Sequence, residues 1–358
     1  MENGTYMKNH NEIKPVRTAI SGCGGVTRDM LEIIRDYPEL DIVAVHDINP
    51  DAAAAIAEQF RISQHLTDFN DLLQTDIELL VINTPNHLHH PQTLHALRER
   101  KHCLVQKPIA TNSTDAREMI QAAKKARKLL GVVMEELGSV FYRQMQNMVQ
   151  TGCIGDVVAV ESMVAHSEYL RNPPPKGNWR TQPDSIGGGS FIQLAIHHLN
   201  LSQWMLNDEI VEVGGKSVSA HNKRTFPEDE TTVAWARFKN GAIGSFISSY
   251  ACDADLLFLY GTGGYIGHRR NIFSWKINKP YQGEVWSCDK APLPGHAVFD
   301  SYNSRPTRIR PQYEQHRRFA LAIRGQAQVE VPGDLGLRDL RIIEAVYKSA
   351  KEGVSVLL

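Results

Sequence analysis

The sequence lacks the features that mark secreted, membrane-spanning and zinc-binding proteins. Its five cysteines are scattered singly and form no CxxC pair, so the sequence indicates neither a disulfide framework nor a zinc site. It has no apolar run long enough to span a bilayer. Residues 1–14 are polar and lack the apolar core of a secretory signal, which predicts a short flexible leader. We therefore expect a cytoplasmic protein.

An excess of one charge is also missing. Lys and Arg total 39, Asp and Glu total 40, and the net charge is −1. This balance gives no electrostatic reason to expect nucleic acid or an anionic membrane as a partner. The chain is 42% hydrophobic and, at 358 residues, too long for one ordinary core, which predicts a globular protein of two domains.

The first third of the chain alternates short β-branched runs with helical patterns. Such alternation predicts right-handed crossovers and a doubly wound parallel sheet, so we expect a Rossmann domain over residues 15–137. The expected strands are Val16–Ser21, Ile42–His46, Glu78–Asn83 and His102–Val105, and the expected helices are Arg28–Tyr37, Asp51–Phe60, Pro91–Arg100 and Ser113–Leu129, with Ser113 as N-cap.

The pattern changes after about Leu137, where strands follow one another without helices between them. This order predicts a second, α+β domain over residues 138–358 that contains a large, mostly antiparallel open sheet. The region from Arg269 to Gln312 has little periodicity and is expected to form long loops. The expected strands are Val157–Val164, Val211–Ser219, Thr231–Phe238 and Gly244–Tyr250, and the closing helices are Gln312–Arg324 and Leu337–Lys351.

A glycine-rich turn between the first strand and helix predicts a dinucleotide site. Its residues are Gly22, Cys23, Gly24, Gly25, Val26 and Thr27, and glycines here allow a tight turn and a close approach of the backbone to a pyrophosphate. Thr27 stands where a third small residue is usual. Asp47 ends the second strand, where an acid binds the ribose hydroxyls of NAD and repels the 2′-phosphate of NADP. NAD is therefore the expected cofactor, although an ordinary glycine turn with a helix-capping Asp47 is the alternative.

Three further segments complete an ordered set of motifs. They are Asn83-Thr84-Pro85-Asn86-His87-Leu88-His89, then Lys101 to Ala110 with Gln106-Lys107-Pro108, and then Trp179-Arg180 with Gly187-Gly188-Gly189 leading to His197. Together with the glycine turn, this set resembles the glucose–fructose oxidoreductase/inositol dehydrogenase (Gfo/Idh/MocA) family from about Val16 to the end of the chain. The resemblance implies an NAD-dependent oxidoreductase acting on CH–OH groups of sugars, glycosides or inositols, with sugar C3 among the expected positions.

The resemblance also implies roles for single residues. Lys107 matches the lysine that contacts the reacting hydroxyl, and His197 matches the catalytic histidine. Gln193 and Gln106 stand where the family usually has aspartate and glutamate. The sequence thus predicts that His197 has no charged partner in Gln193, so the base should be weaker or reduction should be preferred. We expect Thr84, Pro85, Asn86, His89 and Gln106 to line the cofactor cleft beside Lys107, and Arg171, Trp179 and Arg180 to contact substrate with Gln193 and His197.

Helical spacing supports part of this assignment. Gln193, His197 and Asn200 recur at i, i+4 and i+7 and should share one face of a largely apolar helix. A buried polar stripe needs partners, which either a substrate pocket or a self-satisfied core network could supply. His198 lies on another face and is interpreted as structural. The clustered His87, His89 and His90 have no Cys or acid nearby at ligand spacing, so no metal is expected there.

Two other functions share these features. An NAD-dependent glycosidase or lyase would oxidise its substrate transiently and then eliminate, and a non-catalytic NAD-binding protein would explain the two missing carboxylates. Retention of Lys107 and His197 argues against the second alternative. By resemblance, we also expect a homo-dimer or homo-tetramer that pairs through the open face of the second sheet.

Overall fold

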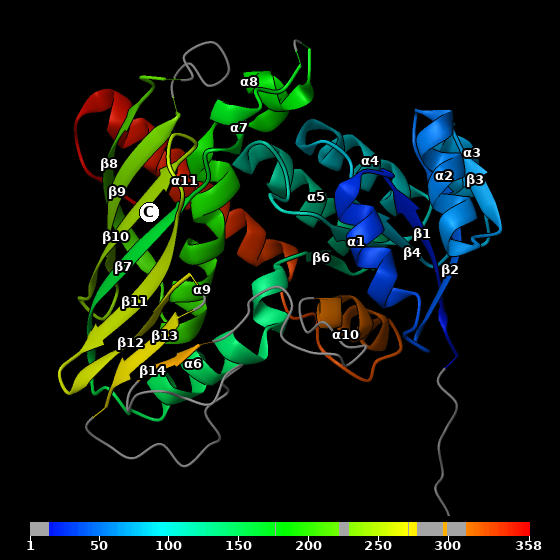
Figure 1. The fold of residues 1–358 in the computed structure, drawn as a ribbon. Coiled ribbons are helices and arrows are strands. Elements are labelled where there is room, and N and C mark those ends of the chain that lie inside the picture. Colours follow the sequence, from blue (N-terminus) through cyan, green and yellow to red (C-terminus); the bar gives the residue numbers. More distant parts are fainter. Residues whose placement is uncertain (1–13, 176, 222–228, 271, 278–295, 299–312) are drawn as a thin grey trace, which may run out of the picture.

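The computed structural model consists of two sheets with helices packed between and around them (Figure 1). It describes residues 14–175, 177–221, 229–270, 272–277, 296–298 and 313–358. The expected leader and most of the expected loop region between Arg269 and Gln312 lie outside these ranges. The architecture confirms the predicted fold class, a Rossmann-like parallel sheet followed by a mostly antiparallel one.

The first sheet has six parallel strands in the order β3-β2-β1-β4-β5-β6, which is doubly wound about β1 and β4. Parallel strands covered on both faces are apolar throughout, and β4 is buried over its whole length. The strands are β1 Val16–Ser21, β2 Leu40–His46, β3 Gln64–Leu66, β4 Leu79–Ile82, β5 His102–Val105 and β6 Leu130–Val132. The helices are α1 Gly25–Ile34, α2 Pro50–Phe60, α3 Phe69–Gln74, α4 Asn86–Arg98 and α5 Ser113–Ala126.

The start of α5 differs from the predicted cap. Ser113 is the first helical residue, and Asn112 before it is the N-cap, because its side chain accepts a hydrogen bond from the amide of Asp115. An asparagine is at least as good a cap as serine. The sequence analysis also missed β3, α3 and β6, which are too short to show a period of their own.

The second sheet has nine strands in the order β14-β13-β12-β11-β7-β10-β9-β8-β15, and only β7 and β10 pair in parallel. The expected loop region contains β13 and β14, because antiparallel pairing of β13 with β12 and of β14 with β13 defines these short strands rather than their own sequence pattern. The strands are β7 Val157–Ala165, β8 Ile210–Val218, β9 Thr231–Phe238, β10 Ile243–Ser249, β11 Ala254–Gly261, β12 Gly264–Arg269, β13 Ile272–Lys276, β14 His296–Val298 and β15 Val356–Leu357.

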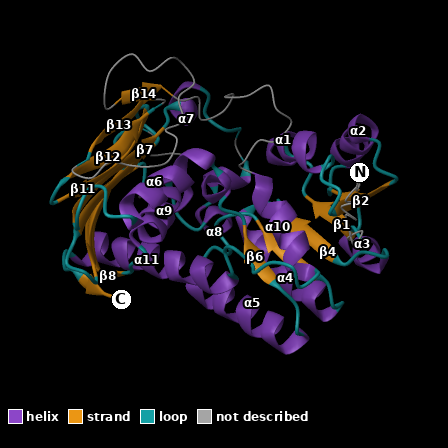
Figure 2. Cartoon of the chain, turned by 90° about the horizontal axis from the view of Figure 1, so that it is seen from below, coloured by secondary structure: helices purple, strands orange, loops and turns teal. Residues whose placement is uncertain are grey.

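Helices cover one face of the second sheet and leave the other open (Figure 2). Along β9, Thr232, Ala234 and Ala236 are buried, whereas Val233 and Trp235 are 49% and 40% exposed. The helices of this half are α6 Val140–Gln150, α7 Glu168–Arg171, α8 Pro183–Ile186, α9 Ile196–Leu206 and α11 Gly333–Glu352, with short η1 Glu135–Gly138, η2 Trp179–Thr181 and η3 Phe191–Ala195.

The chain returns to the parallel sheet near its end through α10 Glu314–Ile323. Phe319 is buried in the same cluster as Ile20 and Leu31 of the parallel half. Gln315 receives a hydrogen bond from the Met134 amide and donates one to the Val132 carbonyl, each at 2.8 Å. We therefore propose that α10 belongs to the dinucleotide-binding half, while the boundary near Leu137 otherwise stays as predicted.

None of the helices in the described ranges has the length and hydropathy of a transmembrane segment.

The docking of α10 gives a stability prediction. Phe319→Ala should remove about 3–5 kcal/mol from the free energy of unfolding, because it leaves a cavity against the strand-edge Gly131. Urea unfolding measures this loss. Val354→Ala is the control, since Val354 is 54% exposed and its truncation should change stability by less than about 0.5 kcal/mol. Equal stability of Phe319→Ala and wild type would contradict the assignment of α10 to this core.

Candidate active site

The glycine turn after β1 has the shape that a pyrophosphate needs. Gly22 adopts a φ of +97°, and a Cβ there would lie 2.7 Å from the backbone of Asn83 after β4. A Cβ at Gly24 or Gly25 would meet nothing within 4 Å, so the first turn of α1 presents open backbone. Exposed amides at a helix N-terminus bind phosphate groups. Val26 follows them in the same first turn and is 42% exposed.

The hydrogen bonds of Thr27 account for a threonine where a third small residue is usual. The side chain is buried, and its Oγ1 donates to the Gly22 carbonyl at 2.5 Å and accepts from Asn83 Nδ2 at 3.0 Å. These bonds connect the turn to the loop after β4. The position therefore holds the turn closed through hydrogen bonds instead of through close packing of a glycine.

Asp47 lies immediately after β2 and faces the glycine turn. Its carboxylate accepts hydrogen bonds from the amides of Cys23 at 2.8 Å and Asn49 at 2.9 Å. The negative charge is thus held beside the turn, at the carboxyl edge of the sheet where dinucleotides bind. Gly22, Gly24, Gly25, Val26, Thr27 and Asp47 come together as the sequence predicted.

Two of the residues after β4 that were expected to line the cofactor cleft are buried. Thr84 and Pro85 are partly exposed at the sheet edge, and buried Asn86 donates to the Ile186 carbonyl at 2.9 Å. His89 is fully buried, and its ring nitrogens lie 2.8 and 2.9 Å from the carbonyl oxygens of Pro108 and Thr84. Burial lowers its pKa to about 4. The prediction that His89 lines the cofactor cleft is wrong, because its ring joins two backbone segments inside the protein.

One group of described side chains lies close enough to share a metal ion, and it is separate from His87, His89 and His90, where no metal was expected. Ligand atoms of His198, Asp255 and His268 lie within 4.8 Å of one another. Protein atoms already bond both rings, because His198 Nδ1 lies 2.9 Å from Ser162 Oγ, and His268 contacts Tyr142 Oη and the Arg270 carbonyl at 3.2 Å. The Ser162 contact agrees with a structural role for His198.

Lys107 contacts the backbone of the segment that leads to His197. Its Nζ donates to the backbone carbonyl of Gln193 at 2.9 Å. Burial lowers the pKa of Lys107, and the carboxylates of Glu136 and Glu135 oppose that shift. Gln106 turns its Oε1 back to accept from the Lys107 amide at 2.8 Å, which fixes the backbone there.

The helix that carries His197 begins with a π-helical turn, η3, and continues as α9. Gln193 contacts Lys107 through its backbone carbonyl, while its side-chain Nε2 is buried and has no hydrogen-bond partner among the described residues. Asn200 instead donates to Asp339 of α11 at 2.7 Å inside the core. The predicted stripe therefore divides into site residues Gln193 and His197 and a core residue, Asn200.

A carboxylate that the sequence analysis missed lies beside His197. Oε1 of Glu136, in η1 after β6, lies 2.7 Å from Nδ1 of His197, and the two side chains are 24% and 19% exposed. The expectation of a weaker base considered only the uncharged Gln193, and Glu136 places a carboxylate beside the ring that this expectation did not include. The only sequence signal was Glu135-Glu136 itself, two acids directly after an apolar segment that ends at the carboxyl edge of the sheet.

The expected substrate residues divide into two groups. The Arg180 guanidinium lies 4.4 Å from the Trp179 ring centroid, and its charge contributes to lowering the pKa of Lys107. Arg171 is mostly exposed and forms an ion pair with Asp253 at 3.0 Å. Trp179 and Arg180 thus lie toward the site, whereas Arg171 is held by Asp253 at the surface.

Aromatic residues that the sequence analysis missed extend the wall of this site. Tyr169 and Tyr250 pack edge to face at 4.9 Å, and His166 lies 5.1 Å from Tyr250 between their rings' centroids. His166 Nδ1 is buried, and no atom in the described part of the chain forms a hydrogen bond with it. Burial lowers the pKa of His166, and the Lys107 charge contributes to this shift. A ring nitrogen and an amide of Gln193 are therefore free to bind a polar ligand.

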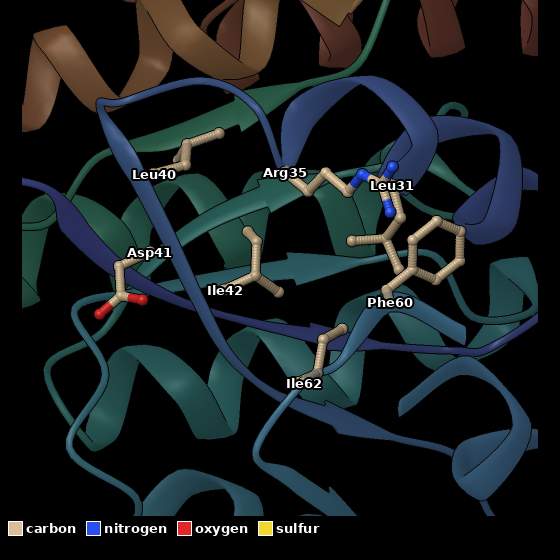
Figure 3. Close-up of a pocket in the computed structure, with 7 residues that line it drawn as sticks. All are labelled: Leu31, Arg35, Leu40, Asp41, Ile42, Phe60 and Ile62. Atoms are coloured by element: carbon tan, nitrogen blue, oxygen red, sulfur yellow. The ribbon is translucent and has the colours of Figure 1, made fainter. Parts of the chain in front are cut away.

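A separate small cavity of about 180 Å³ lies between α1, β2 and α2 (Figure 3). Leu31, Phe60 and Ile62 form its apolar lining, and the Arg35 guanidinium lies 5.6 Å from the Phe60 ring centroid. Leu40 and Asp41 line it at the start of β2, the end of the strand opposite Asp47. It is therefore not part of the cofactor edge.

Comparison with known families identifies the class of protein. Residues 16–134 match the family model described as "Oxidoreductase family, NAD-binding Rossmann fold", and residues 142–267 match the "GFO/IDH/MocA C-terminal domain". The chain belongs to the Gfo/Idh/MocA family of NAD-binding oxidoreductases. This confirms the family, the NAD cofactor and the class of enzyme that the sequence predicted.

Individual relatives act on sugars and related molecules. The chain is 30% identical to a 1,5-anhydro-D-fructose reductase of Ensifer adhaerens, covering 87% of this chain and 90% of the relative. It is 26% identical to a D-glucoside 3-dehydrogenase of Escherichia coli, covering 98% and 100%. The solved structure of an aldose-aldose oxidoreductase from Caulobacter crescentus superposes with a TM-score of 0.82 at 24% identity, covering 96% and 100%.

The position of Asp47 predicts cofactor discrimination. Asp47→Asn keeps one of the two acceptor oxygens that bind the Cys23 and Asn49 amides, and it removes the charge that repels a 2′-phosphate. Affinity for NADP should rise relative to NAD, by about tenfold if one repulsive contact is removed. Fluorescence titration of wild type and variant with both cofactors measures the ratio. An unchanged ratio would show that Asp47 does not face the ribose.

Proposed function

We propose that this enzyme interconverts a secondary hydroxyl and a ketone on a sugar, glycoside, 1,5-anhydrohexitol or inositol, with NAD preferred over NADP. The observation that carries the proposal is the convergence of Lys107 and the Glu136–His197 pair at the carboxyl edge of the Rossmann sheet. NAD, bound on the glycine turn and Asp47, would supply the hydride acceptor or donor.

The site residues have complementary tasks in this reaction. With Nδ1 of His197 facing Glu136, the ring's Nε2 is the nitrogen that takes the hydroxyl proton during oxidation. Lys107 Nζ, held on the Gln193 carbonyl, donates a hydrogen bond to the same oxygen and stabilises the developing alkoxide. In reduction, the protonated His197 returns the proton to the oxygen.

Polyhydroxylated substrates fit the wall of this site. Trp179 offers a flat face, and the Arg180 guanidinium beside it offers donors to ring and hydroxyl oxygens. The unpaired Nε2 of Gln193 and Nδ1 of His166 are buried polar atoms that a substrate hydroxyl could satisfy. The names of the relatives support the same substrate class and make oxidation at sugar C3, or reduction of an anhydroketose, the first reactions to test.

The open face of the second sheet supports the expected homo-oligomer. Val233, Trp235 and Ile243 lie on one face of the sheet. Trp235 of β9 pairs with Ser245 of β10, and side chains two residues apart on a strand, such as Val233 and Trp235 or Ile243 and Ser245, point to the same face. Ile243 is 57% exposed. A second copy on this face would bury the apolar group, and symmetric pairing of identical patches is the commonest form of protein dimer. We propose a dimer or tetramer built on this contact.

Turnover on a substrate panel tests the proposed function. Hexoses, methyl glycosides, 1,5-anhydrohexitols and inositols with NAD, and their ketones with NADH, should include pairs that change NADH absorbance and shift product mass by two hydrogens. Product release without net NADH would indicate elimination instead. Tight NAD binding without any turnover across the panel would contradict the proposal.

The catalytic pair gives a second prediction for the same assay. Lys107→Ala and His197→Ala should each lower kcat about a hundredfold or more, because each removes a group that contacts the reacting oxygen. NAD affinity should change little. His90→Ala is the matched control, since His90 pairs with Glu118 at the surface 3.0 Å away, and near-normal turnover of His197→Ala would contradict its assignment.

The proposed interface predicts a change in oligomeric state. Trp235→Arg should dissociate the oligomer, because it places a charge in the centre of the apolar contact. Analytical ultracentrifugation measures the mass of wild type and variant, and Lys351→Glu, away from this face, is the charge control. A wild-type monomer, or an intact oligomer of Trp235→Arg, would contradict the use of this face.

A further inference from the structure

The segment after β6 places two acidic residues close to His197 and Lys107. Glu135 and Glu136 begin η1, directly after the strand that ends the parallel sheet. His197 lies far away in the sequence, at the start of α9. The ring and the Glu136 carboxylate nevertheless approach to 2.7 Å, and the contact joins the two halves of the chain.

The two acids have opposite protonation behaviour. Burial opposes ionisation of Glu136, but the charge of His197 and its hydrogen bond overcome this effect and lower the Glu136 pKa to about 2. Glu135 is the reverse case, because burial and the neighbouring Glu136 raise its pKa to about 7. Near neutral pH, Glu136 is therefore the acid of this pair that always carries a negative charge.

A charged acceptor at Nδ1 has a definite effect on an imidazole. A neutral ring that donates Nδ1–H to Glu136 keeps Nε2 free as the acceptor for a substrate proton. When Nε2 takes that proton, the carboxylate stabilises the positive ring. Gln193 cannot do this, since its side-chain amide carries no charge. Its contact with Lys107 is made by its backbone carbonyl, which accepts a hydrogen bond from Lys107 Nζ.

Other charges around the ring act on it less directly. The charge of Lys107 helps to lower the pKa of Glu136, and the charge of Glu136 helps to raise the pKa of Asp255. The charge of His197 helps to lower the pKa of His198. The titratable and charged groups that interact electrostatically with His197, or with Glu136 and Lys107, include Glu135 and Glu136 in η1, Arg180 in η2, His198 in α9 and Asp255 in β11. Within this set, Glu136 has the short contact with the His197 ring.

We propose that Glu136 is the positioning residue of His197, which holds Nδ1–H and supplies the negative charge that position 193 does not. This inference rests on the proposed function, in which His197 is the acid–base group. Glu136 lies in the first half of the chain, and the His197 ring that it positions lies in the second half. Correct docking of the two halves then becomes a condition for proton transfer.

Glu136→Gln tests the proposal because it keeps the size and an acceptor oxygen but removes the charge. In the oxidation direction, kcat should fall about tenfold or more. The acidic limb of the kcat/KM profile should move to lower pH by about one unit, since a ring without the carboxylate is harder to protonate. Glu136→Gln/Gln193→Asp should move the limb back toward its wild-type position, because a carboxylate is restored next to the ring.

Glu118→Gln is the matched control. It also removes a carboxylate 3.0 Å from a histidine ring, that of His90, but on the surface of α5. Its pH profile should coincide with that of the wild type. Circular dichroism and NAD titration check that each variant is folded and binds cofactor.

A second readout separates this inference from the proposed function. Nitrogen NMR of the His197 ring, assigned with His197→Gln, follows ring protonation without any substrate. In Glu136→Gln the ring should protonate at lower pH than in the wild type. Reduced activity with an unmoved limb and unmoved ring titration would show that Glu136 is only structural. Unchanged kinetics of Glu136→Gln would also overturn the inference. If the ring titration of Glu136→Gln moves to lower pH but the wild-type enzyme turns over no substrate, the inference holds and the proposed function is rejected.

Discussion

The contact between Glu136 and His197 is the interaction on which the rest of the site depends. It requires a carboxylate to stay ionised where it is largely shielded from water, which is costly unless an opposite charge or hydrogen-bond donor meets it. His197 meets it from another half of the molecule, and Lys107 lies near enough to lower the pKa of Glu136 further. The proposed acid–base groups are therefore assembled by tertiary docking and not by local sequence.

Several buried polar side chains maintain that docking. His89 joins the loop after β4 to the segment that carries Lys107, and Thr27 joins the glycine turn to Asn83. Gln315 of α10 bonds the backbone at Val132 and Met134, immediately before Glu135. Each bond satisfies a buried polar group that would otherwise destabilise the fold. The same bonds fix the three loops that hold cofactor, lysine and carboxylate.

The sequence predicted those parts of the fold and site that local patterns encode. The strand Val16–Ser21, the glycine turn and Asp47 lie where the alternation of strands and helices put them. The same pattern could not show where a buried side chain finds its partner. His89 resembled a cleft residue because its segment follows a strand, but its ring is buried between the carbonyl oxygens of Pro108 and Thr84. Asn200 shared the predicted helical face with His197, yet Asp339 of α11 holds it in the core. Glu136 carried no recognisable motif, because its role depends on a ring about sixty residues later in the chain.

Isotope transfer tests the central claim, hydride exchange at a secondary carbon of a sugar-like ring. Ring-perdeuterated hexosides, 1,5-anhydrohexitols and inositols can be incubated with the enzyme and NAD, and the recovered cofactor analysed by mass spectrometry. The account predicts NADH that carries one deuterium, together with a ketone that lacks one, in wild type and far more slowly in His197→Ala. Conversion of a deuterated substrate with no deuterium in the recovered cofactor or returned to the product would contradict it.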